Sequence, residues 1–175
     1  MAQTFLALGY KLSSEAATTR IYVWRALKDL GAASLLQGVS VLPNKPDFLA
    51  RLGELREKVE EAKGVANIME LTFVRPEDES KIVAEFRRLR DEEYEELAEN
   101  CERLIYDLDY ESGKGRYAFT ELEEGEEDLV KLKRWLARIE RRDFFHAERG
   151  AKAHESLASA AARLADYSGE VFKRE

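Results

Sequence analysis

Apolar positions along residues 1–75 switch repeatedly between the two-residue period of a strand and the longer period of a helix. Runs of strand length predict four strands, at Phe5–Tyr10, 32–36, 39–42 and 65–74. The second and third runs flank Gln37-Gly38, which predicts a hairpin turn. In the fourth run, alternate positions are expected to share one face of the sheet: Val65, Met69, Leu71 and Phe73.

Two helices are predicted between these strands, because apolar residues recur there three or four positions apart. The first begins near Ser13 and Ser14, whose hydroxyls suit a helix N-terminus, and ends at Gly31. The second begins at Pro46 and ends at Gly64. The resulting order βαββαβ is the ferredoxin-like pattern of an antiparallel sheet with two helices. We therefore predict an α+β domain over residues 1–75.

From residue 76 onward the apolar period is helical. A first long helix carries one apolar stripe, formed by Ile82, Phe86, Leu89, Leu97, Cys101, Leu104 and Leu108. Glycines at 113 and 115 interrupt it, and the capping-box sequence from Thr120 to Glu123 predicts a second helix that begins at Thr120. A third helix is expected over about 151–172. These helices predict an antiparallel three-helix bundle over residues 76–175, packed on the sheet domain.

The net charge of −7 is unevenly distributed along the chain. Residues 1–75 hold 10 Lys/Arg and 8 Asp/Glu, residues 76–128 hold 7 and 20, and residues 129–175 hold 11 and 7. An acidic middle between two mildly basic ends is typical of long exposed helices. A groove that binds nucleic acid would instead carry clustered cations, so this charge distribution supports DNA binding only weakly.

The composition favours a cytoplasmic protein without a membrane span. A single cysteine cannot form an internal disulfide, and residues 1–4 carry no basic secretory leader. No window approaches the roughly 18 apolar residues that a spanning helix needs.

Residues that could support catalysis or metal binding are few. Cys101 lies on the apolar stripe of the long helix, where a buried structural thiol is the simplest interpretation. His146 and His154 lack metal-ligand spacing, and the glutamates from Glu92 to Glu102 suit a solvated helix face. Glycine-rich phosphate loops are absent from the sequence. We therefore assign no catalytic residue, metal or cofactor.

The strongest candidate binding residues are the cations beside Trp24 in the first helix. Arg20 and Arg25 offer guanidinium donors that suit a tetrahedral oxyanion such as chromate or sulfate. Five positions turn these two residues about 140° apart on a helix, so they would need help from elsewhere, for which Arg142 is a candidate. The alternative is that all of these cations pair with acids and support packing.

Four ordered motifs resemble the N-terminal domain of the chromate resistance protein ChrB. Two lie near the start, at Arg20–Ala32 and Gln37–Pro43. A third, Phe86 to Tyr94, is similar to the family's F-x-x-x-R-D-x-E-Y segment, and a fourth runs from Arg134 to Phe145. The resemblance implies a ferredoxin-like domain with added helices and a role in chromate resistance beside an efflux transporter.

The expected function is therefore that of an accessory or regulatory protein of chromate resistance, acting through protein association or oxyanion-linked transcriptional control. Full-length members of the family carry a second, C-terminal domain, so a separate chain with that domain is an expected partner, and a homo-oligomer is another. Two alternatives stay open: a DNA-binding regulator in its own right, and a thiol- or metal-dependent oxyanion reductase.

Overall fold

The computed structural model of this chain describes residues 2–174 and divides into two compact units. The first unit extends to Arg87 and the second begins at Arg88.

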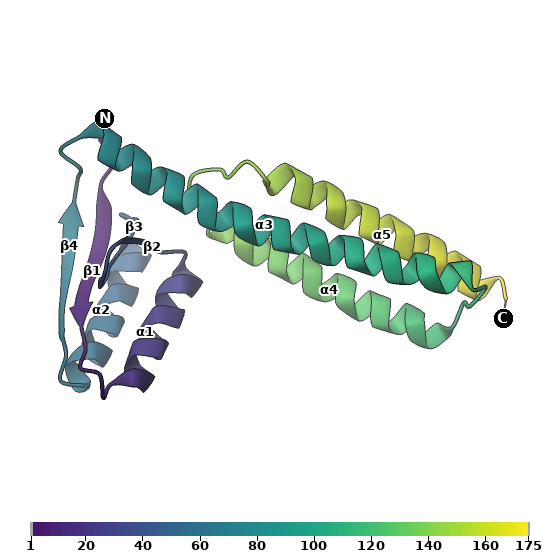
Figure 1. The fold of residues 1–175 in the computed structure, drawn as a ribbon, viewed down its shortest axis with the longest axis horizontal. Coiled ribbons are helices and arrows are strands. Elements are labelled where there is room, and N and C mark those ends of the chain that lie inside the picture. Colours follow the sequence, from purple (N-terminus) through teal and green to yellow (C-terminus); the bar gives the residue numbers. More distant parts are fainter. Residues whose placement is uncertain (1, 175) are drawn as a thin grey trace. The chain divides into compact units, whose positions relative to one another are not determined.

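The first unit contains a four-stranded antiparallel sheet (Figure 1). Its strands are β1 (Phe5–Lys11), β2 (Ala33–Leu36), β3 (Val39–Pro43) and β4 (Val65–Leu71), in the order β2-β3-β1-β4. With helices α1 (Ala17–Leu30) and α2 (Pro46–Glu61), the order of elements in this unit is β, α, β, β, α, β. The predicted α+β class is confirmed.

The hairpin turn between β2 and β3 depends on Gly38. Its φ of 76° lies in the left-handed region, which glycine adopts without steric cost. Tyr10 of β1 donates its backbone N–H to the carbonyl of Gly38 at 2.8 Å. A Cβ at this position would lie 2.8 Å from the Tyr10 carbonyl oxygen, so a side chain here would push β1 away from the hairpin.

The alternation predicted for β4 is present, but one of its two faces is largely exposed. Directly opposite residues of an antiparallel pair lie on the same face, and Met69 pairs with Ala7 while Leu71 pairs with Phe5. On that face Val65 is 64% exposed and Met69 is 40% exposed. Ala66, on the other face, is buried, and α2 packs against β4 and β1.

The two helices of the first unit begin and end close to the predicted positions, with one correction at the N-terminus of α1. Gly31 closes α1 in the left-handed conformation, with φ of 86°. The serines do not cap the helix: Ala16 occupies the N-cap position, and no side chain bonds to the free N–H groups there. The first turn of α2 contains Pro46, as predicted, and α2 ends at Glu61, before Gly64.

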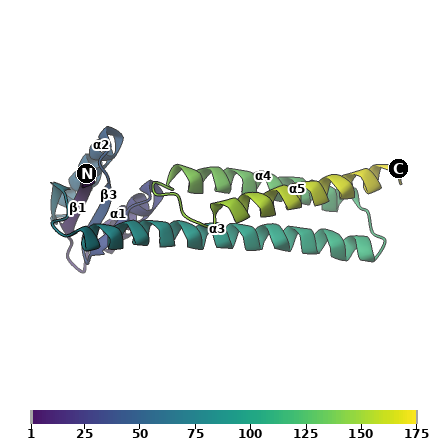
Figure 2. The ribbon, with the colours of Figure 1, turned by 90° about the horizontal axis from the view of Figure 1, so that it is seen from above.

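The second unit is a three-helix bundle. It contains α3 (Pro76–Gly113) from Arg88 onward, α4 (Phe119–Arg141) and α5 (Gly150–Phe172). Both views show the three helices side by side, with α4 running opposite to α3 and α5 (Figures 1 and 2). Their facing stripes form one apolar core, which includes Leu97, Leu104, Leu132, Ile139, Leu157 and Leu164.

Two tyrosines also fill this core, and sequence periodicity did not single them out. Tyr94 occupies the gap in the apolar stripe of α3, and Tyr167 is fully buried on α5. The hydroxyl of Tyr167 donates to the carbonyl of Arg116 at 3.1 Å and accepts the N–H of Ala118 at 3.2 Å. A buried tyrosine is tolerated here because its hydroxyl has partners.

α4 begins at Phe119, one residue before the predicted Thr120, and the predicted capping box is absent. Ala118 is the N-cap and Thr120 already lies inside the helix, so no local side chain caps the first turn. The Tyr167 hydroxyl binds the Ala118 N–H instead. Across residues 2–174, no helix combines the length and apolarity that crossing a bilayer requires.

Candidate functional site

The outer face of α1 exposes large apolar side chains. Val23, Ala26 and Leu27 are buried on its inner face. Ile21, Tyr22 and Trp24 are 49%, 43% and 56% exposed on the other side. A helix that only covered a sheet would bury one stripe and leave the rest polar. Hence α1 carries more apolar surface than its own packing uses. We call Ile21, Tyr22 and Trp24 the α1 surface.

The cations around Trp24 have different local roles. The Lys28 ammonium lies 5.2 Å from the centre of the Trp24 ring, within range of a cation–π contact. Arg20 Nη2 donates to the carbonyl oxygens of Ser13 at 2.8 Å and Leu12 at 3.2 Å. Arg20 therefore ties the loop after β1 to α1.

Arg25 lines a hollow of about 380 Å³ between α1 and α2. Arg51, from α2, lies on the same hollow, and the other lining residues are Thr18, Ile21, Tyr22, Ala26 and Asp29. Arg51 forms an ion pair with Glu54. This contact, and then the neighbouring Tyr22 hydroxyl, raise the pKa of the Arg51 guanidinium. The structure thus brings Arg25 together with Arg51, which the sequence did not single out.

Arg142 belongs to the second unit and is engaged by neighbouring groups. Its Nη1 lies 2.9 Å from Glu93 Oε1, and its Nε donates to the Arg138 carbonyl at 3.0 Å. Glu93 also faces Arg90, whose side chain is only 4% exposed. Arg90 Nε lies 3.2 Å from Glu93 Oε2, close enough for an ion pair but not aligned as a hydrogen bond. One carboxylate therefore serves two guanidiniums.

Further polar contacts join the same parts of the chain. Arg90 Nη1 donates to the Arg142 carbonyl at 3.3 Å. The Tyr94 hydroxyl donates to Asp143 Oδ2 at 3.0 Å, and Asp143 Oδ1 accepts the N–H of Ala147 at 2.9 Å. Burial, and then the contact with Asp143, raise the pKa of Tyr94, while burial lowers the pKa of Arg90. We call Arg90, Glu93, Tyr94, Arg142 and Asp143 the buried polar network.

The buried polar network gives a structural role to residues of two of the four sequence motifs. The segment Arg90–Tyr94 lies on α3, and Arg142–Asp143 lies where α4 ends. Their side chains hold the connection between α4 and α5 against α3. The role visible for Arg142 is this support of the fold.

Cys101 is buried, as predicted. It has no exposed surface and belongs to the apolar core of the bundle. Burial, and to a smaller extent the charge of Glu102, raise the pKa of its thiol. A thiol that reduces an oxidant needs access and a lowered pKa, and Cys101 has neither.

We expect native Cys101 to react slowly with an aromatic disulfide reagent at neutral pH, because the thiol is inaccessible and protonated. The released chromophore should appear at the rate of global opening and become rapid in denaturant. Complete labelling within the mixing time, without denaturant, would contradict this expectation and revive the reductase alternative.

Two of the remaining chemical candidates, His154 and Glu92, have side-chain partners. His154 contacts Glu140, and Glu92 forms an ion pair with Arg88 on the outer face of α3. Within residues 2–174, no group of three His, Cys, Asp or Glu side chains is placed to hold a metal ion.

In a comparison with protein families, residues 20–175 match the family model described as Protein ChrB, N-terminal. The chain belongs to this family. Membership in the ChrB N-terminal family links it to chromate resistance. The matched range contains the α1 surface and the buried polar network. No curated protein and no solved structure shows a significant match.

Proposed function

We propose that this ChrB-family protein is an accessory or regulatory protein of chromate resistance, which acts in the cytoplasm by binding another protein through the α1 surface. The exposure of Ile21, Tyr22 and Trp24 on one helix carries the proposal. Tryptophan, tyrosine and arginine are the side chains that contribute most often to binding energy at protein interfaces. Arg20 and Arg25 on the same helix would add charge at the rim.

The partner we propose is a chain that carries the ChrB C-terminal domain. Association of the two would place the halves of a chromate-responsive regulator of transcription in one complex. The test is calorimetric titration of the purified C-terminal-domain protein into this chain. A saturable one-to-one heat supports the proposal, and no binding with both proteins folded contradicts it.

A second candidate function is oxyanion binding in the hollow between α1 and α2, because two guanidiniums line it. Arg25 and Arg51 offer planar donors, of which Arg51 also pairs with Glu54. The side chains of Thr18 and Tyr22 lie on the same hollow. Asp29 also lines the hollow and would repel an anion at its own end. A chromate or sulfate ion is therefore expected beside the two arginines, with Trp24 on the adjoining surface.

We expect sulfate and chromate to bind the wild-type protein, and Arg25→Lys and Arg51→Lys each to raise the dissociation constant about tenfold. Lysine keeps the charge but removes the fork of donors. Arg20→Lys should leave binding unchanged, because Arg20 does not line the hollow and donates instead to the backbone of the preceding loop. Calorimetric titration of the four proteins measures this. Absence of binding at millimolar anion, or equal affinities in all four, would contradict the oxyanion site.

A further inference from the structure

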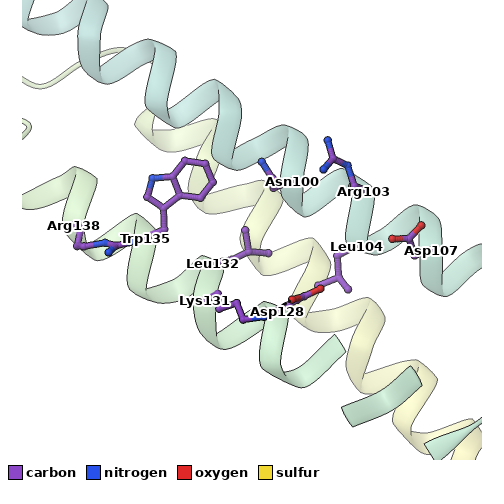
Figure 3. Close-up of a pocket in the computed structure, with 9 residues that line it drawn as sticks. All are labelled: Asn100, Arg103, Leu104, Asp107, Asp128, Lys131, Leu132, Trp135 and Arg138. Carbon is purple, nitrogen blue, oxygen red and sulfur yellow. Dashed lines mark hydrogen bonds and ion pairs between the residues drawn. The ribbon is translucent and has the colours of Figure 1, made fainter. Parts of the chain in front are cut away.

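A groove of about 320 Å³ lies between α3 and α4 in the second unit (Figure 3). Leu104 and Leu132 extend into the space between the two helices, and the indole of Trp135 reaches from α4 toward α3. The other residues that line the groove are polar: Asn100, Arg103, Asp107, Asp128, Lys131 and Arg138. The groove thus combines an apolar floor, one aromatic wall and a charged rim.

The charges on the rim are not all paired with one another. Lys131 Nζ lies 3.1 Å from Asp128, so these two neutralise each other. Asn100 donates its amide to the Glu96 carbonyl at 2.8 Å. Within the part of the chain that the structure describes, the guanidiniums of Arg103 and Arg138 have no ion pair or hydrogen bond. Two cations are therefore available to a ligand.

The charged side chains are distributed unevenly along the groove. Because α3 and α4 run in opposite directions, Asn100 lies at the same end as Trp135 and Arg138, while Asp107 and Asp128 lie at the other (Figure 3). A negative group would be repelled at the Asp107 end and attracted at the end with Arg138, with Arg103 between them.

We propose that this groove binds a small planar aromatic anion. The aromatic body would stack on Trp135 above Leu104 and Leu132, and its carboxylate or sulfonate would pair with Arg103 or Arg138. The volume lies near the lower end of the range of ligand pockets, which suits a compound of one or two fused rings. This site is separate from the α1 surface, and its occupancy does not depend on the proposed partner.

The test uses the two tryptophans as reporters. In the ¹H–¹⁵N spectrum of the full chain, the indole N–H signals of Trp24 and Trp135 are assigned with Trp24→Phe. Titration with 1-naphthoate should shift the Trp135 signal saturably and leave Trp24 unchanged. Neutral 1-naphthalenemethanol and inorganic sulfate should each shift the Trp135 signal much less at the same concentration. The alcohol lacks the negative charge and sulfate lacks the aromatic ring. No Trp135 shift, or an equal shift with either single-feature probe, overturns the proposal.

Variants of the rim test the role of charge. At least one of Arg103→Gln and Arg138→Gln should raise the dissociation constant for 1-naphthoate about tenfold, the effect of losing one charged hydrogen bond. Arg134→Gln, an exposed change on α4 outside the groove, should leave affinity unchanged. All three side chains are exposed, so each variant is expected to fold. Unchanged affinity in both rim variants overturns the assignment.

Discussion

Replacing Glu93 by glutamine is expected to lower the free energy of unfolding by about 3 kcal/mol. The carboxylate of Glu93 faces the guanidiniums of Arg90 and Arg142, and Arg90 is almost completely buried. Glutamine keeps the shape but removes the charge that both cations share. Breaking a buried pair from one side costs about 3–5 kcal/mol, because the remaining charge stays in a poorly solvated position.

Urea unfolding followed by circular dichroism measures this change, and Glu96→Gln is the matched control. Glu96 is on the same helix but exposed, so its replacement should change stability by less than about 0.5 kcal/mol. Equal stability of Glu93→Gln and Glu96→Gln would show that the buried polar network contributes little to the fold. Arg142 would then become free for a role in ligand binding.

Replacing Trp24 by alanine is expected to weaken binding to the C-terminal-domain partner about thirtyfold. That factor corresponds to about 2 kcal/mol, the lower limit for an interface residue that dominates binding. Trp24 is more than half exposed, so its loss should leave the fold intact. The measurement is the calorimetric titration of the partner described above, with circular dichroism on each protein.

The control for this prediction is Tyr106→Ala. Tyr106 is an exposed aromatic residue on α3, and its removal tests whether any exposed aromatic side chain contributes to binding. We expect wild-type affinity for Tyr106→Ala. If Trp24→Ala also binds with wild-type affinity, the partner uses another surface.

The spacing of apolar residues predicted the helices and strands well, because most of them pack through one continuous apolar run or one apolar stripe. β1 begins with a continuous apolar run, Phe5 to Leu8, that is buried, and each bundle helix has one stripe directed to one core. The error at the start of α4 occurred where a long-range contact replaced a local signal. The predicted cap at Thr120 is absent, since the Tyr167 hydroxyl from α5 binds the free N–H of Ala118. No local pattern near residue 118 indicates that contact.

The candidate site was only partly predictable for the same reason. The sequence indicated Arg25, but its neighbour Arg51 comes from α2, and sequence alone does not show which turns of two helices face one another. Likewise, the sequence offers Arg142 as a candidate oxyanion ligand but does not indicate its contact with Glu93, which lies 49 positions away. The exposure of Trp24 could not be read from the sequence either, because an aromatic residue in a helix is equally consistent with a core position.

The most direct test of the account is chromate tolerance in the organism that encodes this protein. Three strains are compared: wild type, a deletion of the gene, and a strain that expresses Trp24→Ala at the wild-type level. If the protein acts in chromate resistance through the α1 surface, the Trp24→Ala strain should show the altered tolerance of the deletion strain. Wild-type tolerance in the Trp24→Ala strain, beside a deletion strain whose tolerance has changed, would contradict it.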